Sequence, residues 1–292
     1  MPSRGKTLAV SFLELVKPKQ LLLLMITMYG AYLASPVTHK LETVALMTAA
    51  GLGAMGGTTA LNMYVERDID ALMPRTAGRP IPSGRVGEAA ALSFSVSLLA
   101  IGIAFSSLIG RRFLLATLLG VYFDLVGYTI LTKRLNPVIA LFVGGLAGAM
   151  PALGGWAAGT GSFVPGGLLL AAVVFFWQPI HVGLISLTYR EDYALAGLPA
   201  LSLALSASQL RMLVRVSTSA IVASIWLFYA SMGYGLATAL ATTVFSVIFA
   251  RKYVAKLNES CTGKCSFSVL RRASLLVAIP FAALPVESIV GV

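Results

Sequence analysis

Three oxygen-bearing side chains recur at four-residue intervals in the stretch 62–70. Asn62, Glu66 and Asp70 stand at positions i, i+4 and i+8, a spacing that places all three on one face of an α-helix. Two stacked carboxylates repel each other unless a cation lies between them. Mg²⁺ accepts such oxygen ligands and keeps waters and substrate phosphates as the others. The spacing therefore predicts a metal site for an anionic substrate.

A stiff basic loop follows this acidic column. Pro74 ends the helix, because a proline ring removes a backbone donor and blocks the preceding turn. Arg75 and Arg79 then stand four residues apart, and Pro80 stiffens the chain behind them. Guanidinium groups match phosphate oxygens in shape and charge, so these two arginines are candidate diphosphate ligands. Arg85 is accounted for by membrane topology and is left out.

A solvated helix end is the simpler interpretation of the same segment. Glu66 and Asp70 would then pair with Arg67 or Arg75 at the surface and would bind nothing. For an acidic turn taken alone, this interpretation is the better one. The stiff basic loop beside the turn shifts the balance toward an anion-binding site.

A second polar cluster follows the sixth apolar stretch of the chain. Eleven residues separate His181 from Asp192. On a continuous helix this is nearly three turns, so the two would share a face, with His181 about 16 Å deeper in the bilayer. Polar residues at that depth face a cavity or a protein partner. His181 is equally well explained as a contact of an acceptor substrate or as a packed histidine bonded to a neighbouring helix.

The fourth apolar stretch carries an ionisable residue at mid-depth and two cations at its end. Asp124 lies midway along it, where either a functional group or a structural pairing is expected. Lys133 and Arg134 lie where the stretch leaves the membrane. They serve either as an orientation signal or, with Arg190, as part of a basic ring around the acidic column.

Composition identifies the elements that must position these residues. Of the 292 residues, 58% are hydrophobic and 11% charged, and the mean hydropathy is +0.87, values typical of a membrane protein. Spanning segments must be helical, because lipid leaves no partner for an unpaired backbone group. We expect an all-α, polytopic bundle in one domain, 1–292, around a central cavity open to the cytoplasm. Its nine apolar stretches are 20–35, 43–65, 88–108, 112–132, 137–158, 167–188, 210–230, 236–254 and 272–290.

The distribution of basic residues orients this bundle. Nineteen of the 22 Lys and Arg residues fall on one side of the expected spans, and the positive side of a membrane protein is the cytoplasmic one. The N-terminus is therefore expected inside the cell membrane and the C-terminus outside, with no cleaved signal. The net charge of +11 then reflects orientation and attraction to membrane lipid, which removes the need for a nucleic-acid partner.

Two cysteines lie in the cytoplasmic loop before the last expected span. Cys261 and Cys265 are too few for a tetrahedral zinc site and have no histidine nearby. We expect both to be reduced and assign them no role.

The acidic column and the loop behind it resemble the first aspartate-rich motif of the UbiA superfamily of intramembrane prenyltransferases. That superfamily shows Asn-Asp-x-x-Asp-x-x-x-Asp. This chain has Met63 and Glu66 at the first two aspartate positions and keeps Asp70. The resemblance runs from Lys17 to residues near 200, and the last three spans share only hydropathy. It implies a helical membrane enzyme that transfers a prenyl group from a prenyl diphosphate with Mg²⁺.

Later motifs are similar to one branch of that superfamily, the heme farnesyltransferases or heme O synthases. They are Tyr-Thr-x-x-x-Lys-Arg at 128–134, Trp-Gln-Pro-x-His at 177–181 and Tyr-Arg-Glu-Asp-Tyr at 189–193. The branch implies farnesyl diphosphate and heme B as substrates and heme O as product. The roles so implied are catalytic metal ligands for Asn62, Glu66, Asp70 and Asp192, diphosphate contacts for Arg75, Arg79, Lys133, Arg134 and Arg190, and acceptor contacts for His181 and Asp124.

Two other functions stay open at this point. A related prenyltransferase would use an aromatic acid, a quinone precursor or a lipid alcohol as acceptor. An ion-coupled transporter would use Asp124 and His181 as an ion path. The mouth position of the acidic column and the phosphate-type basic loop favour the enzymes. The oligomeric state is not predicted.

Overall fold

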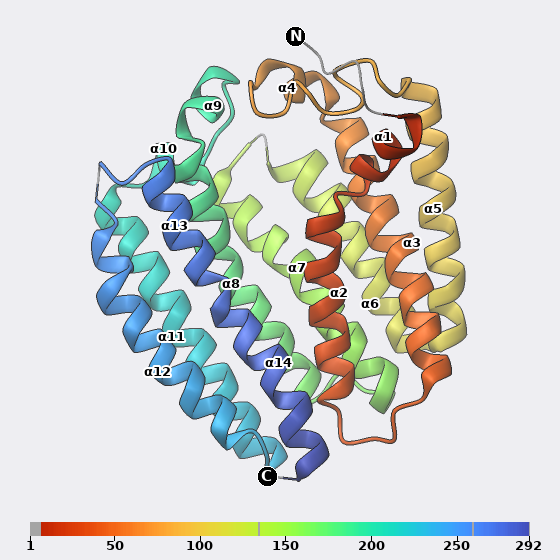
Figure 1. Ribbon diagram of the computed structural model, residues 1–292, viewed down its shortest axis with the longest axis vertical. Coiled ribbons are helices and arrows are strands. Elements are labelled where there is room, and N and C mark those ends of the chain that lie inside the picture. The colour runs from red at the N-terminus through yellow and green to blue at the C-terminus, as the bar shows by residue number, and fades with distance from the viewer. Residues whose placement is uncertain (1–6, 134, 259, 292) are drawn as a thin grey trace.

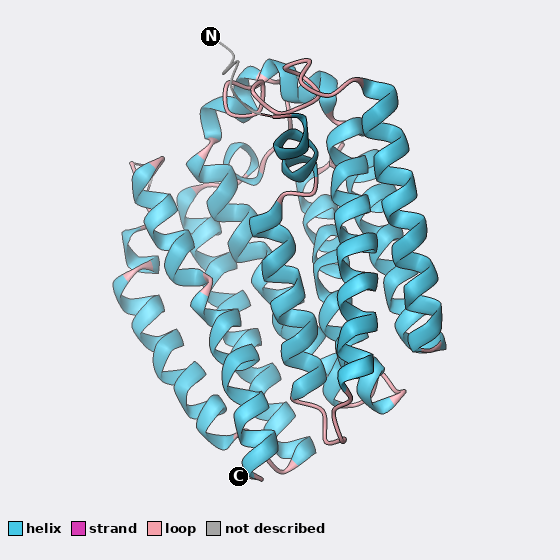
Figure 2. Ribbon diagram, turned by 45° about the vertical axis from the view of Figure 1, so that its right-hand side comes forward, coloured by secondary structure: helices cyan, strands magenta, loops and turns pink. Residues whose placement is uncertain are grey.

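Long helices running along a common axis make up the molecule. The computed structural model describes residues 7–133, 135–258 and 260–291, and every regular element within them is a helix. The helices lie side by side along the longest axis (Figure 1), and loops join them near the two ends (Figure 2). Such pairing of all backbone groups within helices is what an apolar chain in lipid requires. The predicted all-helical membrane bundle is confirmed.

Each of the expected spans contains a helix. The long helices are α2 (Pro18–Leu33), α3 (Leu41–Val65), α5 (Glu88–Ile109), α6 (Arg111–Val121) continued by η1 (Tyr122–Thr132), α7 (Pro137–Thr160), α8 (Gly166–Thr188), α11 (Ala207–Met232), α12 (Leu236–Lys252), and α13 (Lys264–Ala273) continued by α14 (Leu275–Val290). The short ones are α1 (Leu8–Leu15), α4 (Arg67–Leu72), α9 (Arg190–Leu195), α10 (Leu201–Ala204) and η2 (Val254–Lys256).

Seven stretches among the described residues are long and apolar enough to cross a membrane. The helices α2 and α12 have 16 and 17 residues, slightly fewer than the roughly 20 that span the hydrocarbon without help from flanking residues. The expected number of nine spans is therefore approximate. The helices α1, α4 and α9 lie at one end of the bundle, and α14 ends at the other (Figure 1).

Glycines allow the helices to approach closely. A Cβ atom on Gly102 of α5 would lie 2.0 Å from the backbone nitrogen of Ala54 in α3. A Cβ on Gly155 of α7 would lie 1.9 Å from the carbonyl oxygen of Met28 in α2. Small residues are what let backbones pack in lipid, where helix association gains nothing from leaving water. Of these four helices, α2, α3 and α7 line the central cavity.

Two expected helices depart from regular α geometry. The range 112–132 changes at residue 122 from α6 to η1, an eleven-residue π-helix whose last bond runs from the Lys133 N–H to the Tyr128 oxygen at 2.9 Å. The helix α8 continues through Pro179 but ends at Thr188. At Tyr189 the backbone has φ −117° and ψ 33°, and α9 begins beyond it. π-Helices are rare and occur often at functional sites.

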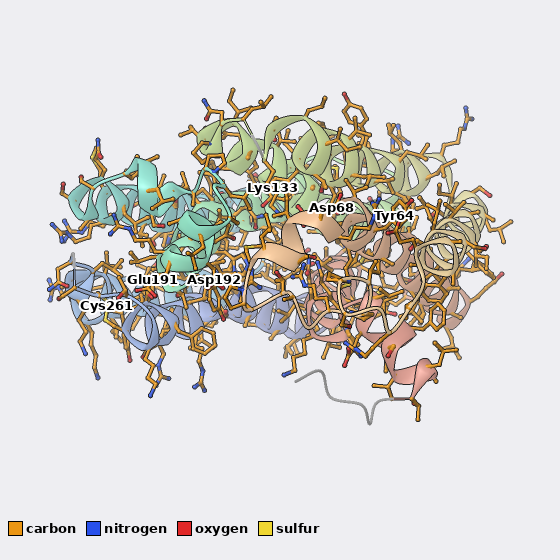
Figure 3. All side chains as sticks on the ribbon, turned by 90° about the horizontal axis from the view of Figure 1, so that it is seen from above. Tyr64, Asp68, Lys133, Glu191, Asp192 and Cys261 are labelled. Carbon is orange, nitrogen blue, oxygen red and sulfur yellow. A yellow bond between two sulfur atoms is a disulfide. The ribbon has the colours of Figure 1, made fainter. Side chains whose placement is uncertain are left out.

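The two cysteines form a disulfide, so the expectation that both are reduced is wrong. Cys261, in the loop before α13, is joined to Cys265, the second residue of that helix, with Cα atoms 5.1 Å apart. That separation lies inside the range of about 4.4–6.8 Å that a disulfide needs. The prediction considered only how many thiols were available to bind zinc and not how close the turn would bring them. Cys261 lies toward the edge of the end of the bundle that carries α4 and α9 (Figure 3).

Candidate active site

The acidic column is continuous across a break between two helices. Glu66 joins α3 to α4, with φ −92° and ψ 1°. The helical bonding nevertheless continues: the Glu66 N–H donates to the Asn62 oxygen at 3.0 Å, and the Asp70 N–H donates to the Glu66 oxygen at 2.8 Å. The three side chains therefore keep one face, as the spacing predicts. They are 8%, 6% and 1% exposed, respectively, so this is not a solvated helix end.

Each buried carboxylate of the column contacts a cation from a distant part of the chain or from the loop. Lys133, at the end of η1, donates to Glu66 Oε1. Arg79 donates through Nη1 to Asp70 Oδ2 at 2.5 Å. Buried charges persist only when they are paired in this way. The column thus carries two carboxylates and two cations in direct contact.

The neighbouring arginines do not make the pairs of the simpler interpretation. Arg67 contacts Glu88 on α5 at 3.1 Å. Arg75 reaches across to Asp192 on α9 at 3.8 Å, and its guanidinium lies 4.6 Å from the centre of the Tyr189 ring. Asp192 and Lys133 lie near the middle of this end of the bundle when it is viewed from above (Figure 3).

The loop after α4 is fixed by hydrogen bonds. The Thr76 hydroxyl donates to the Asp70 carbonyl at 2.8 Å. Arg85 donates to the Glu14 carboxylate at 2.7 Å and to the Ser11 hydroxyl at 3.0 Å, both on α1. Arg85 therefore fastens the loop that carries Arg79, a structural role consistent with its omission from the candidate ligands.

The π-helix η1 positions the inner end of the column. The Asn62 amide nitrogen donates to the Thr129 hydroxyl at 2.6 Å, and that hydroxyl donates to the Asp124 carbonyl at 2.8 Å. This bond uses the amide nitrogen of Asn62. It does not engage the amide oxygen, which is the potential metal ligand. Sequence reasoning missed Thr129, since nothing in its local pattern marks it as a partner of a residue 67 positions away.

Lys133 is held in its charged form. Burial lowers the pKa of the Lys133 ammonium, but the nearby Tyr128 and Glu66 raise it further than burial lowers it, so that the net pKa lies above the usual value. Its Nζ also lies 5.6 Å from the centre of the Tyr128 ring. The raised pKa favours the charged form of Lys133 beside the column.

A cavity of about 560 Å³ opens beside the column and extends into the bundle, a volume within the range of substrate pockets. Its polar lining includes every residue of the column. Its deeper walls come from α2, α3, α6, α7 and α8. The charged and polar lining residues are Lys17, Lys19, Gln20, Thr58, Thr59, Asn62, Glu66, Asp70, Arg75, Arg79, Thr117, Asp124, Tyr128, Lys133, Trp177, Gln178, His181 and Tyr193, and the apolar ones include Leu24, Met28, Met55, Phe113, Val121, Met150 and Ile185.

His181 lines this cavity from α8. Its ring stacks on that of Trp177, with centroids 4.4 Å apart, and the Trp177 indole donates to the Ala273 carbonyl at 3.0 Å. The buried Nδ1 of His181 has no hydrogen-bond partner among the described residues. The bond from this atom to a neighbouring helix, which the packed-histidine interpretation would need, is therefore absent among the described residues. Trp177 fixes its ring plane.

The cluster around residue 190 is arranged differently from the expectation. The break at Tyr189 divides the continuous helix that was expected between His181 and Asp192 into α8 and α9. Asp192 contacts Arg75 and is not among the residues that line the cavity. Arg190 is exposed and lines a separate pocket of about 80 Å³. Arg134 lies outside the described residues.

Lys17 is a lining residue that sequence reasoning did not select. It connects α1 to α2 and faces the same cavity as the column. Burial lowers its pKa to about 8. The charges of Arg79 and Lys133 act in the same direction, and those of Glu66 and Asp124 oppose it. A lysine with this pKa loses its charge near neutral to mildly basic pH unless an anion binds to it.

The donor set of the column fits Mg²⁺. The described part of the chain contains no group of three or more His, Cys, Asp or Glu side chains that could hold a metal ion, so the site depends on the Asn62 amide and on ligands from outside the protein. One amide and two carboxylates beside an open cavity form an incomplete oxygen shell, and Mg²⁺ typically completes such a shell with waters and substrate phosphates. A softer metal would need thiolate or imidazole ligands, which the column lacks.

Comparison with known proteins agrees with these features. The UbiA prenyltransferase family matches residues 23–275. Protoheme IX farnesyltransferase of Aeropyrum pernix is 40% identical over 277 residues, which cover 95% of this chain and 91% of that protein. A structure of digeranylgeranylglyceryl phosphate synthase superposes with a TM-score of 0.78 at 18% identity, covering 97% of this chain and 99% of the other. A UbiA homologue from Archaeoglobus fulgidus bound to GPP and Mg²⁺ has a TM-score of 0.70 at 18% identity, covering 94% and 99%. The two structural matches show the shared fold.

Proposed function

The chain belongs to the UbiA prenyltransferase family, and we propose that it farnesylates heme. It transfers the farnesyl group of farnesyl diphosphate to a vinyl group of heme B and so makes heme O. The assignment of a prenyl diphosphate as donor rests on one observation. The buried column of Asn62, Glu66 and Asp70 is paired with cations at the mouth of an apolar cavity. The acceptor half is supported by the relative from Aeropyrum pernix, which is a protoheme IX farnesyltransferase.

The column is proposed to hold the diphosphate through Mg²⁺. The ligands are the Asn62 amide oxygen and the carboxylates of Glu66 and Asp70, while Thr129 keeps the amide in place. The homologue from Archaeoglobus fulgidus that binds GPP together with Mg²⁺ supports this assignment. Mg²⁺, when bound, neutralises charge that develops on the departing diphosphate.

Cations around the column assist the same step. Lys133 and Arg79 already contact the two carboxylates, so both lie within reach of a diphosphate bound beside them. Arg75 lines the cavity and is oriented by Asp192 and by the Tyr189 ring. We therefore assign Asp192 to positioning Arg75 and leave the exposed Arg190 out of the set. Fixed charges aimed at the leaving group favour ionisation, because they need no rearrangement during the reaction.

The apolar part of the cavity receives the farnesyl chain and excludes water. The carbon–oxygen bond of the allylic diphosphate breaks, and a vinyl carbon of the acceptor bonds to the farnesyl C1. Water then adds to the other vinyl carbon and releases a proton, which gives the hydroxyethylfarnesyl side chain. A water-poor cavity protects the allylic cation from hydrolysis before the vinyl group reacts. His181, with Nδ1 unpartnered among the described residues and its ring fixed by Trp177, is placed to contact the acceptor.

The mouth of the cavity is proposed to face the cytoplasm. The chain is an integral membrane protein with seven membrane-length helices in its described part. The basic loops lie on the side of α4 and α9, which by the positive-inside rule puts that end of the bundle inside the cell membrane and the end of α14 outside. Both substrates would then enter from the cytoplasmic leaflet.

A prenyltransferase with another acceptor is the second candidate. The fold match to digeranylgeranylglyceryl phosphate synthase keeps it open, although at 18% identity it shows the fold alone. An ion-coupled transporter is set aside, because the family match covers most of the chain. Expression in a host that lacks heme O separates the two enzymes. We expect extracted hemes to gain the farnesylated species, and prenylated lipid or quinone precursors without it would contradict the proposal.

A further inference from the structure

Lys17 has a backbone conformation that lysine rarely adopts. Its φ of 47° and ψ of 71° are left-handed, and it is the one non-glycine residue with positive φ among the described residues. This conformation is costly for a residue with a Cβ atom, and it persists only where the surrounding structure imposes it. Such residues concentrate at functional sites, so the role of the Lys17 side chain needs an explanation.

The contacts on both sides of Lys17 hold it in place. Its N–H donates to the Glu14 carbonyl at 3.2 Å, and its own carbonyl accepts the N–H groups of Gln20 and Leu21 at 2.9 Å and 3.1 Å. The preceding helix α1 is itself fastened to the loop after α4, because Arg85 contacts the Glu14 carboxylate at 2.7 Å. The turn at Lys17 is therefore braced against the loop that carries Arg79, and its side chain lines the cavity.

The charges that line the cavity are not balanced on the α2 side. Five cations line it (Lys17, Lys19, Arg75, Arg79 and Lys133) against three carboxylates (Glu66, Asp70 and Asp124). Lys133, Arg79 and Arg75 each contact a carboxylate. Within the described ranges, no hydrogen bond or ion pair involves the ammonium groups of Lys17 or Lys19. The wall formed by α2 thus presents two cations that contact no carboxylate directly, although Glu66 and Asp124 lie near enough to act on the charge of Lys17, as Arg79 and Lys133 also do.

Resting on the proposed function, we propose that Lys17, with Lys19 beside it, binds the propionate carboxylates of the acceptor. Heme B carries two carboxylates on an otherwise apolar ring. They cannot enter the apolar depth of the cavity without a cation, and the column is occupied by the diphosphate. The diphosphate is also an anion, so the two substrates need separate groups of cations. The α2 wall provides the second group.

This placement also orients the acceptor. The propionates and the vinyl groups occupy opposite edges of the porphyrin. Carboxylates bound at Lys17 would therefore direct the vinyl edge inward, toward the part of the cavity that His181 lines. Lys17 is thus a positioning residue for the acceptor, and its loss should affect acceptor binding more than the chemical step.

The test compares heme B with its dimethyl ester, in which the carboxylates are uncharged. Lys17→Gly removes the ammonium while glycine adopts the left-handed backbone without strain. Lys17→Arg restores the charge. Lys252→Gln is the matched control, since Lys252 is an exposed cation outside the cavity. For each purified protein, KM is measured for both acceptors and for farnesyl diphosphate, and acceptor binding is titrated by heme absorbance.

We expect Lys17→Gly to raise KM and the titrated Kd for heme B by about tenfold, the effect of one charge-assisted hydrogen bond. The KM for farnesyl diphosphate and both constants for the dimethyl ester should stay unchanged. Lys17→Arg should recover most of the loss, and Lys252→Gln should match the wild-type protein. A rise in KM for farnesyl diphosphate would assign Lys17 to the diphosphate. An equal loss of affinity for the ester would show that Lys17 does not act on the carboxylates. Either result would overturn the inference. Wild-type protein that transfers nothing to heme B would refute the proposed function instead.

Discussion

Replacing Asp70 by Asn should slow farnesyl transfer by about three orders of magnitude. Asp70 is 1% exposed, and its carboxylate contacts Arg79 at 2.5 Å. Asparagine keeps the size of the side chain and one oxygen but removes the charge. Unit charges about 4 Å apart interact by roughly 4 kcal/mol at an effective dielectric constant near 20. Since each 1.4 kcal/mol is about tenfold in rate, losing that charge beside the metal costs about 10³ in kcat.

A neighbouring acid provides the matched control for this variant. Asp68 lies on the same helix, α4, but is exposed and does not line the cavity. Asp68→Asn should leave the rate within about twofold, because exposed charges far from a site contribute little. Both variants are purified in detergent and assayed at saturating Mg²⁺ by mass detection of farnesylated heme, and their melting temperatures are recorded.

Loss of fold must be separated from loss of the metal ligand. Asp70→Asn leaves Arg79 without its carboxylate, which lowers stability as well. The double variant Asp70→Asn, Arg79→Gln removes that unpaired cation, so it should recover melting temperature without recovering activity. The reasoning is refuted if Asp70→Asn retains more than a tenth of the wild-type rate, or if Asp68→Asn loses as much activity.

Three further predictions concern the metal, the packing and the pH dependence. Chelation of divalent cations should stop transfer while heme binding by absorbance titration persists, and Mg²⁺ should restore the rate; full activity after chelation would exclude the metal. Gly155→Ala should lower the melting temperature by several degrees, consistent with roughly 1–3 kcal/mol for an overpacked contact, since its Cβ would meet the Met28 carbonyl oxygen at 1.9 Å. Gly148→Ala, with its nearest contact at 3.8 Å, is the control and should melt as wild type does. The kcat/KM for heme B should fall as pH rises through about 8, the pKa to which burial and Arg79 lower Lys17, because only the protonated amine attracts carboxylates. The fall should be absent from Lys17→Gly. If kcat/KM of that variant falls near pH 8 as it does in the wild-type protein, the assignment is contradicted.

The local parts of the site could be predicted from the sequence. The spacing of Asn62, Glu66 and Asp70 placed them on one face, and the backbone bonds across the break at Glu66 preserve that face. Such periodicity depends only on helix geometry, which a bilayer enforces. The stiff loop after Pro74 likewise brought Arg79 to the column.

The pairing across helices could not be predicted in the same way. Lys133 and Thr129 reach the column from 67 residues away, and the π-helix that brings them there has no clear sequence signal. The helix break at Tyr189 turned Asp192 toward Arg75 and left Arg190 exposed. In both cases tertiary packing determines which residues a side chain contacts, and helical spacing alone does not determine this.

The left-handed turn at Lys17 was missed for a related reason. A lysine followed by Pro18 looks like an ordinary helix start with a topology-determining charge. Only the contacts of Glu14 and Arg85 show that the turn is braced and that the side chain lines the cavity. A backbone state that the fold imposes leaves no trace in the composition of the segment.

Incubation of the purified chain with heme B, farnesyl diphosphate and Mg²⁺, followed by mass analysis of the extracted heme, tests the central claim most directly. We predict one product whose mass equals heme B plus a farnesyl group and a hydroxyl group, formed together with one diphosphate. Diphosphate release without any farnesylated heme, or prenylation of an aromatic acid or lipid alcohol in its place, would contradict it.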